Sequence, residues 1–94
     1  MISIITPSYN SQRFIGYTIK SVQSQTFNDW ELLIVDDCSM DNSVEVIKEY
    51  VKKDERIKLF PLLKNVGAAE ARNLALRRAK GKYIAFLDSD TFYE

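Results

Sequence analysis

The chain has 94 residues, of which 46% are apolar and 28% charged, and its 13 basic residues balance 13 acidic ones. This length allows one domain with a modest core, and zero net charge argues against a nucleic-acid partner held by a basic surface. The lack of histidine excludes Ser-His-Asp and Cys-His catalysis and histidine-ligated zinc from this stretch, and the single cysteine, Cys38, excludes an internal disulfide.

The first part of the chain predicts a strand, a helix and a second strand. Residues 1–6 are rich in β-branched isoleucine, and Pro7 ends the run, as is typical of a short strand. Apolar residues at helical spacing predict a helix over residues 13–25. The continuous apolar run 32–35, which ends at the acidic pair Asp36-Asp37, predicts a strand buried on both faces.

The middle of the chain predicts a second helix and a weaker strand. Asn42 is followed three residues later by Glu45, a spacing that predicts a capping box for a helix ending near Lys53. Residues 57–62 form an apolar run that Pro61 interrupts. Because proline cannot donate to a ladder, we expect this strand to lie near an edge of the sheet.

The last part predicts a third helix and a fourth strand. Residues 68–79 form a helix with a face of alanines, whose small side chains would let its backbone approach a sheet, and Gly81 is expected to end it. The apolar run 83–87 predicts a buried strand. It ends in Asp88-Ser89-Asp90, where strand alternation would point both carboxylates the same way.

Strands that alternate with helices predict an α/β fold. The strands begin about 25 to 30 residues apart, which is the size of a right-handed βαβ crossover. We therefore expect a Rossmann-like parallel sheet with helices on both faces, in three layers.

Polar side chains follow three of the four predicted strands, and ligands bind at this carboxyl edge of open parallel sheets. The three segments are 6–10, with the aromatic Tyr9, the pair Asp36-Asp37, and Asp88-Ser89-Asp90. Tyr9 could stack on a planar base, and a carboxylate could accept hydrogen bonds from a base imide or from ribose hydroxyls. Paired carboxylates could also hold a divalent cation that bridges phosphates.

Each segment also has an ordinary structural interpretation. Asp36-Asp37 could be turn or cap residues, and Asp88-Ser89-Asp90 could be a solvated turn. Arg72, near the start of the third helix, could pair with Glu70 or face solvent. The functional interpretation rests on the expected convergence of all these residues at one edge of the sheet.

Six segments in order resemble family 2 glycosyltransferases, and together they extend over the whole chain. The segments are 4–10 (IITPSYN), 21–27 (SVQSQTF), 30–37 (WELLIVDD), 65–67 (NVG), 71–73 (ARN) and 81–90 (GKYIAFLDSD). The resemblance implies the GT-A fold, a nucleotide-sugar-binding sheet with strand order 3-2-1-4 in this part.

The resemblance also implies which residues would contact the base of a bound nucleotide. Pro7 and Tyr9 would contact the base, usually uracil, or stack on it. Asp37 would accept a hydrogen bond from the imide of the base, and Asp36 would support Asp37.

The resemblance also implies that Arg72 approaches the base or the diphosphate of the nucleotide. Asp88 would contact the ribose, and Asp90 would ligate Mn²⁺ or Mg²⁺ between the phosphates. A metal ion there acts as a Lewis acid that neutralises the charge on the departing nucleoside diphosphate.

The chain departs from the family pattern at three places. Cys38 and Met40 stand where the family commonly has glycine and threonine, and Thr91 follows Asp90 where a further aspartate is common. The general base and the acceptor-binding half are expected beyond Glu94. We therefore expect residues 1–94 to be a donor-binding part, truncated after the Asp-x-Asp motif and inactive alone.

Two other classes of protein compete with this interpretation. Residues 87–91 match the Asp-x-Asp-x-Thr motif of haloacid-dehalogenase-like phosphatases, in which Asp88 would be the nucleophile, but that motif normally follows the first strand. A non-catalytic nucleotide-binding or phospho-receiver module also groups acidic residues at strand ends, but its acidic pair follows the first strand and not the second.

The resemblance leads us to expect sugar transfer from a nucleotide-sugar, commonly a UDP-sugar, to a saccharide or other hydroxyl acceptor, with inversion. Polysaccharide synthesis is one such pathway. The full-length protein is expected in the cytoplasm, at the inner face of the membrane. An open sheet edge beside the fourth strand would permit self-association.

Overall fold

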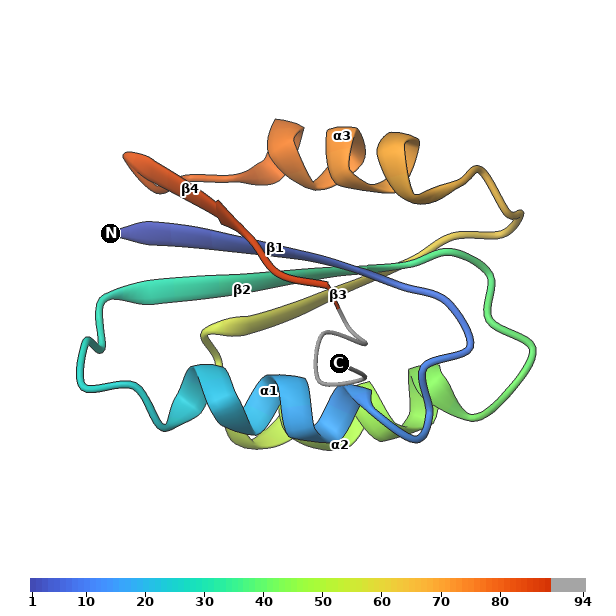
Figure 1. Cartoon of the computed structure of the whole chain (residues 1–94), viewed down its shortest axis with the longest axis horizontal. Helices are drawn as coiled ribbons and strands as arrows, with labels where there is room; N and C mark the ends of the chain where they lie inside the picture. Colours follow the sequence, from blue (N-terminus) through green and yellow to red (C-terminus); the bar gives the residue numbers. More distant parts are fainter. Residues whose placement is uncertain (89–94) are drawn as a thin grey trace.

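The structure is a computed structural model that describes residues 1–88, where strands and helices alternate (Figure 1). The strands are β1 Ile2–Ser8, β2 Trp30–Asp36, β3 Ile57–Pro61 and β4 Tyr83–Phe86. The helices are α1 Ile15–Gln23, α2 Ser43–Lys53 and α3 Ala68–Arg78. Among these residues, no helix has the length and apolar character needed to cross a bilayer.

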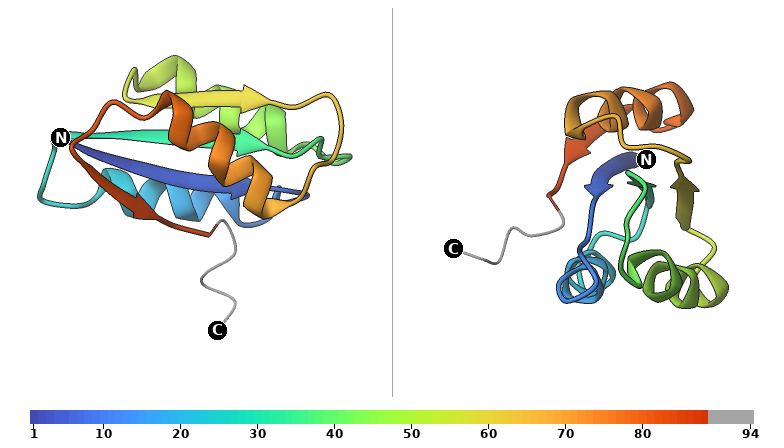
Figure 2. Two further views of the ribbon diagram at one scale, coloured as in Figure 1. Left: turned by 90° about the horizontal axis from the view of Figure 1, so that it is seen from above. Right: turned by 90° about the vertical axis from the view of Figure 1, so that its right-hand side faces the viewer.

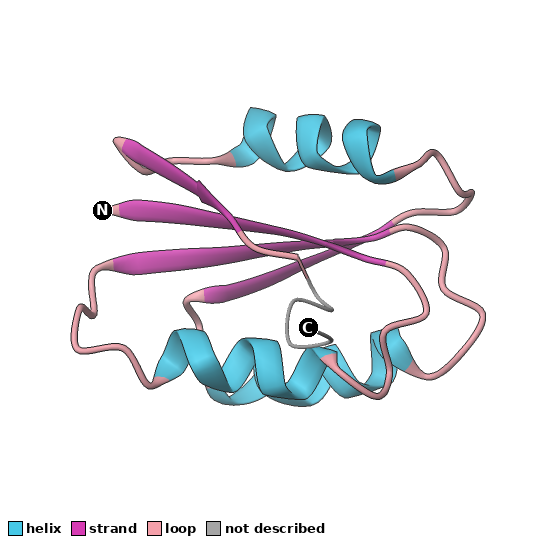
Figure 3. Cartoon of the chain, in the orientation of Figure 1, coloured by secondary structure: helices cyan, strands magenta, loops and turns pink. Residues whose placement is uncertain are grey.

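The strands form one parallel sheet in the order β3-β2-β1-β4. Helices α1 and α2 cover one face of this sheet and α3 covers the other (Figure 2 and Figure 3). The predicted α/β class, the three layers and the strand order 3-2-1-4 are confirmed, as is the edge position of β3. The carboxyl ends of all the strands therefore lie at one edge of the sheet, where ligands bind in such folds.

Alternation along β2 divides its side chains between two cores. Trp30 and Ile34 are buried in the core between the sheet and α1 and α2. Leu33 is buried on the opposite face, where it belongs to a cluster with Ala71 and Ala75 of α3. These alanines confirm the predicted small face of the third helix, and the two-sided burial of β2 explains its continuous apolar sequence.

The predicted fourth strand is present as β4, Tyr83–Phe86, but the expectation that it is buried is wrong. Tyr83, Ile84 and Phe86 are 60%, 40% and 55% exposed. β4 is an edge strand, and α3 packs on β1 and β2 and not over β4. Within residues 1–88, no strand pairs with the outer side of β4, so the predicted open edge is present in this part of the chain.

The capping box predicted at α2 is also wrong, because the Asn42 side chain makes no cap hydrogen bond. Asp41 takes over this role: its Oδ1 accepts the backbone N–H of Ser43 at 2.9 Å. The Asn42 N–H instead donates to Oε1 of Gln12, at 3.0 Å. A partner from another loop therefore overrides the local pattern.

Gly81 does not cap α3, contrary to expectation. The helix ends at Arg78, and Ala79 already has an extended backbone. Gly81 instead lies against β1, where a Cβ atom would fall 2.7 Å from the backbone nitrogen of Ser3 and 2.8 Å from the carbonyl oxygen of Met1. Its lack of a side chain serves the docking of β4 on β1.

Candidate functional site

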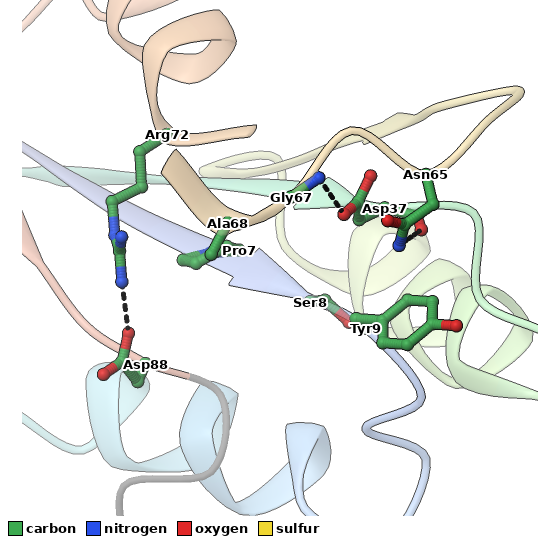
Figure 4. Close-up of a pocket in the computed structure, with 9 residues that line it drawn as sticks. All are labelled: Pro7, Ser8, Tyr9, Asp37, Asn65, Gly67, Ala68, Arg72 and Asp88. Atoms are coloured by element: carbon green, nitrogen blue, oxygen red, sulfur yellow. Dashed lines mark hydrogen bonds and ion pairs between the residues drawn. The ribbon is translucent and has the colours of Figure 1, made fainter. Parts of the chain in front are cut away.

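A pocket of about 400 Å³ opens at the carboxyl edge of the sheet (Figure 4). The end of β1, the residue after β2, the β3–α3 loop, α3 and the residues after β4 all contribute to it. Its lining residues are Pro7, Ser8, Tyr9, Asp37, Asn65, Gly67, Ala68, Arg72 and Asp88. Segments that are far apart in the sequence thus meet at the place where the sequence predicted a site.

Most of the predicted site residues line this pocket, namely Pro7, Tyr9, Asp37, Arg72 and Asp88. Asp36 does not line it, and Asp90 lies outside the described residues. Four lining residues had no predicted role: Ser8, Asn65, Gly67 and Ala68. The break in the apolar pattern at Asn65-Val66-Gly67, just before a small-residue helix, is the signal that could have found three of them.

Asp37 connects β2 to the loop before α3. It is only 4% exposed, and its Oδ1 accepts the N–H of Val66 at 2.7 Å while its Oδ2 accepts the N–H of Gly67 at 2.8 Å. Asn65 donates from Nδ2 to the backbone carbonyl of Asp37 at 3.2 Å. Asp37 therefore fixes the loop that forms one wall of the pocket, and each carboxylate oxygen keeps further acceptor capacity.

Asp36 has a different environment from its neighbour. It is 1% exposed and its carboxylate accepts hydrogen bonds from Ser8 and Ser39. Strand alternation explains this difference, because successive side chains point to opposite faces of a sheet. Asp37 thus lies on the α3 side, and Asp36 lies on the side of α1 and α2.

Arg72 and Asp88 form an ion pair across the pocket, with 3.0 Å between Nη2 and Oδ1 (Figure 4). Their side chains are 33% and 55% exposed, so solvent weakens the attraction between them. The sequence also allowed Arg72 to pair with Glu70, but in the structure Arg72 pairs with Asp88. An ion pair that is this accessible can exchange partners when a charged ligand enters.

A metal ion would depend on few protein ligands here. Residues 1–88 contain no group of three or more side chains placed to hold a metal ion. Mg²⁺ commonly takes only one or two carboxylates and completes its shell with phosphates and water. The half-exposed carboxylate of Asp88 is accessible for that role once Arg72 releases it, whereas the predicted ligand Asp90 is outside the described residues.

Cys38 occupies a left-handed backbone position in the loop after β2, with a φ of 62°. This conformation costs a non-glycine residue about 1–2 kcal/mol, and glycine would adopt it without that cost. Cys38→Gly is expected to raise the free energy of unfolding by up to about 1 kcal/mol, because the greater freedom of glycine in the unfolded chain offsets part of the relief.

Urea unfolding measures how Cys38→Gly changes the free energy of unfolding, and Gly67→Ala is the matched control. Gly67 has a φ of 94°, so alanine there introduces a side chain at a positive φ and is expected to destabilise the fold. A loss of stability in Cys38→Gly would contradict the presence of strain at Cys38.

The fold is the GT-A fold of glycosyltransferases, as solved structures of similar shape show. The crystal structure of S. aureus TarS 1-349 in complex with UDP has a TM-score of 0.87 and 36% identity, over 95% of this chain and 27% of that one. The mannosyltransferase PcManGT from Pyrobaculum calidifontis, in complex with GDP-Man and Mn2+, has a TM-score of 0.88 and 25% identity over the same shares.

The chain belongs to glycosyl transferase family 2, whose model matches residues 3–94. It is 52% identical over 90 residues to the putative teichuronic acid biosynthesis glycosyltransferase TuaG of Bacillus subtilis, covering 96% of this chain and 36% of that protein. It is 48% identical over 93 residues to the UDP-Glc:alpha-D-GlcNAc-diphosphoundecaprenol beta-1,3-glucosyltransferase WfgD of Escherichia coli, with 99% and 36% covered. The chain thus spans about a third of the length of these relatives. The match favours the transferase interpretation over a phosphatase.

Proposed function

We propose that this chain binds the nucleotide of a UDP-sugar, and that the complete protein transfers the sugar to a saccharide or other hydroxyl acceptor with inversion. The proposal rests on one observation: the same pocket is lined by Tyr9, Asp37, Arg72 and Asp88. Relatives support it, because TarS is described in complex with UDP and WfgD is named as a UDP-Glc transferase. Synthesis of a cell-surface polysaccharide at the inner face of the membrane is part of this proposal.

The base binds between Tyr9 and Asp37. Tyr9 is 49% exposed, which leaves its ring free to stack, and Asp37 supplies a carboxylate oxygen to the same pocket. The imide N–H of uracil can donate to that oxygen. Cytosine and the N1 edge of adenine present a lone pair there, so the carboxylate repels them. This difference in hydrogen bonding gives a preference for UDP over CDP and ADP.

The diphosphate binds at the Arg72 and Asp88 end of the pocket. The guanidinium of Arg72 pairs with phosphate oxygens, and Asp88 is released for the ribose or for Mn²⁺ or Mg²⁺, together with Asp90. A metal ion bound there would supply charge neutralisation for the leaving diphosphate. PcManGT, a relative in structure, is described with Mn2+.

Calorimetric titration tests the proposal with UDP, CDP and ADP, each with and without Mn²⁺. We expect UDP to bind at least about tenfold more tightly than CDP or ADP, because one imide hydrogen bond to a charged acceptor contributes about 1.5–3 kcal/mol. Mn²⁺ is expected to strengthen UDP binding. Absence of UDP binding at millimolar concentration, together with reaction of Asp88 with BeF₃⁻, would instead support the phosphatase alternative.

Arg72→Ala is expected to weaken UDP binding by about 10- to 100-fold, because the charged hydrogen bond that it removes is worth about 1.5–3 kcal/mol. Its effect on stability is small, since the ion pair that it breaks is accessible to solvent. Arg77→Ala, in the last turn of the same helix and outside the pocket lining, is the matched control. Equal UDP affinities in the two variants would exclude a role for Arg72 in binding.

A further inference from the structure

The loops after β1 and β2 are joined by reciprocal hydrogen bonds. The backbone N–H of Asn10 donates to Oγ of Ser39 at 2.9 Å, and the N–H of Met40 donates to Oδ1 of Asn10 at 2.8 Å. Further along the same loops, three more bonds run from Gln12 N–H to Asp41, from Asn42 N–H to Gln12 and from Ser11 N–H to Ser43. The segment after Tyr9 is therefore fastened to the segment after Asp37.

The buried carboxylate of Asp36 anchors this connection. Its Oδ1 accepts the hydroxyl of Ser39 at 2.6 Å, and its Oδ2 accepts the N–H of Ser39 at 2.9 Å. A serine hydroxyl carries one hydrogen, and Ser39 gives that hydrogen to Asp36. The lone pairs of Ser39 Oγ then face the N–H of Asn10, so the direction of every hydrogen bond in the chain Asn10 to Ser39 to Asp36 is fixed.

Asp36 holds the chain on both sides of Tyr9. The hydroxyl of Ser8 donates to Oδ1 of Asp36 at 3.1 Å. On the other side of Tyr9, the N–H of Asn10 donates to Ser39, which in turn donates to Asp36. Asn10 has a φ of 48°, a left-handed conformation that asparagine tolerates better than most residues, and the hydrogen bonds to Ser39 and Met40 hold it there. Tyr9 itself is half-exposed, so burial does not fix its ring, and the hydrogen bonds of its two neighbours hold the backbone that carries the ring.

We propose that Asp36, acting through Ser39 and Asn10, is the positioning residue for Tyr9 and thereby sets the affinity for the base and not for the diphosphate. The inference rests on the proposed nucleotide site. The two adjacent aspartates then divide their tasks by strand alternation. Asp37 fixes the β3–α3 wall of the pocket, and Asp36 fixes the Tyr9 wall.

The test replaces Ser39 and compares binding of UDP with binding of inorganic pyrophosphate, both in Mn²⁺. Aromatic stacking on a base is worth on the order of tenfold in affinity. We therefore expect Ser39→Ala to weaken UDP binding by about fivefold to tenfold and to leave pyrophosphate binding unchanged. Ser39→Thr keeps the hydroxyl and is expected to restore UDP affinity. Ser24→Ala, which removes an exposed hydroxyl that donates to the carbonyl of Ser21 at the end of α1, is the control for lost stability.

A double-mutant cycle with Tyr9→Ala separates positioning from a general structural effect. If Ser39 acts through Tyr9, Ser39→Ala costs no further UDP affinity in the Tyr9→Ala background. Equal losses for UDP and pyrophosphate, or an undiminished loss in that background, overturn the inference while UDP binding by the unmodified protein keeps the proposed function intact. An unmodified protein that binds neither ligand overturns both.

Discussion

Replacing Asp37 by alanine is expected to weaken UDP binding by at least about 100-fold and to lower the free energy of unfolding by about 3–6 kcal/mol. Hydrogen bonds to charged groups contribute about 1.5–3 kcal/mol each, and Asp37 accepts two from Val66 and Gly67. The substitution therefore releases the β3–α3 loop and removes the proposed acceptor for the base imide in one step. No other lining residue combines both tasks in the described part of the chain.

Asp37→Asn separates these two tasks. Asparagine keeps the shape of the side chain, but its amide group presents an N–H₂ where one backbone N–H needs an acceptor. We expect a smaller loss of stability, of about 1–2 kcal/mol, and a reduced preference for UDP over CDP, because an amide can donate to cytosine as well as accept from uracil.

Urea unfolding and calorimetric titration of the folded protein measure the stability and the binding separately. Glu70→Gln, also a carboxylate-to-amide change, lies in the first turn of α3 and outside the pocket lining, so it is the control. UDP affinity that survives Asp37→Ala would show that the base does not bind at this carboxylate.

The fold was predictable because its signals are local. β2 is one apolar run since both its faces are buried, and the alanines of α3 mark a helix that packs closely on a sheet. The convergence of Tyr9, Asp37 and Asp88 followed from topology alone, since the carboxyl ends of parallel strands share one edge.

The features that sequence could not predict depend on contacts between distant residues. The hydrogen bonds of Asp37 to Val66 and Gly67 span 29 and 30 residues, so no local pattern reveals them. The apolar run 83–87 suggested a buried strand, yet β4 is exposed because it lies at the open edge of the sheet, a position that the expected strand order 3-2-1-4 already implied. The opposite directions of Asp36 and Asp37 could likewise have been read from strand alternation.

Gly81→Ala is expected to lower the free energy of unfolding by about 2–4 kcal/mol, as is typical of severe overpacking or a broken buried network. The added Cβ would lie 2.7 Å from both the nitrogen and Oγ of Ser3, and a backbone atom cannot move aside as a flexible side chain does. The same spot holds a buried network. Ser3 Oγ donates to Oε2 of Glu31 at 2.6 Å, and the N–H groups of Lys80 and Gly81 donate to Glu31 and Ser3.

The pH dependence of the free energy of unfolding identifies this mechanism. Burial alone would raise the pKa of Glu31, but hydrogen bonds from Ser3 and Lys80 outweigh it and hold the pKa below the ordinary 4.5. The network therefore stabilises the fold above pH 4.5, and this contribution is lost as the pH falls through the lower folded pKa. In Gly81→Ala, we expect the free energy of unfolding to fall less on acidification than it does in the unmodified protein.

Gly16→Ala is the matched control for Gly81→Ala. It places a Cβ 3.1 Å from the hydroxyl of Tyr50, the far end of a movable side chain, and alanine favours the helix α1 by about 1 kcal/mol. We expect it to be nearly neutral or stabilising. If Gly81→Ala were equally mild, the close contact between β4 and β1 would not be a requirement of the fold. If the contact is required, shifting β4 also displaces Asp88, two residues beyond its end, so UDP binding weakens together with stability.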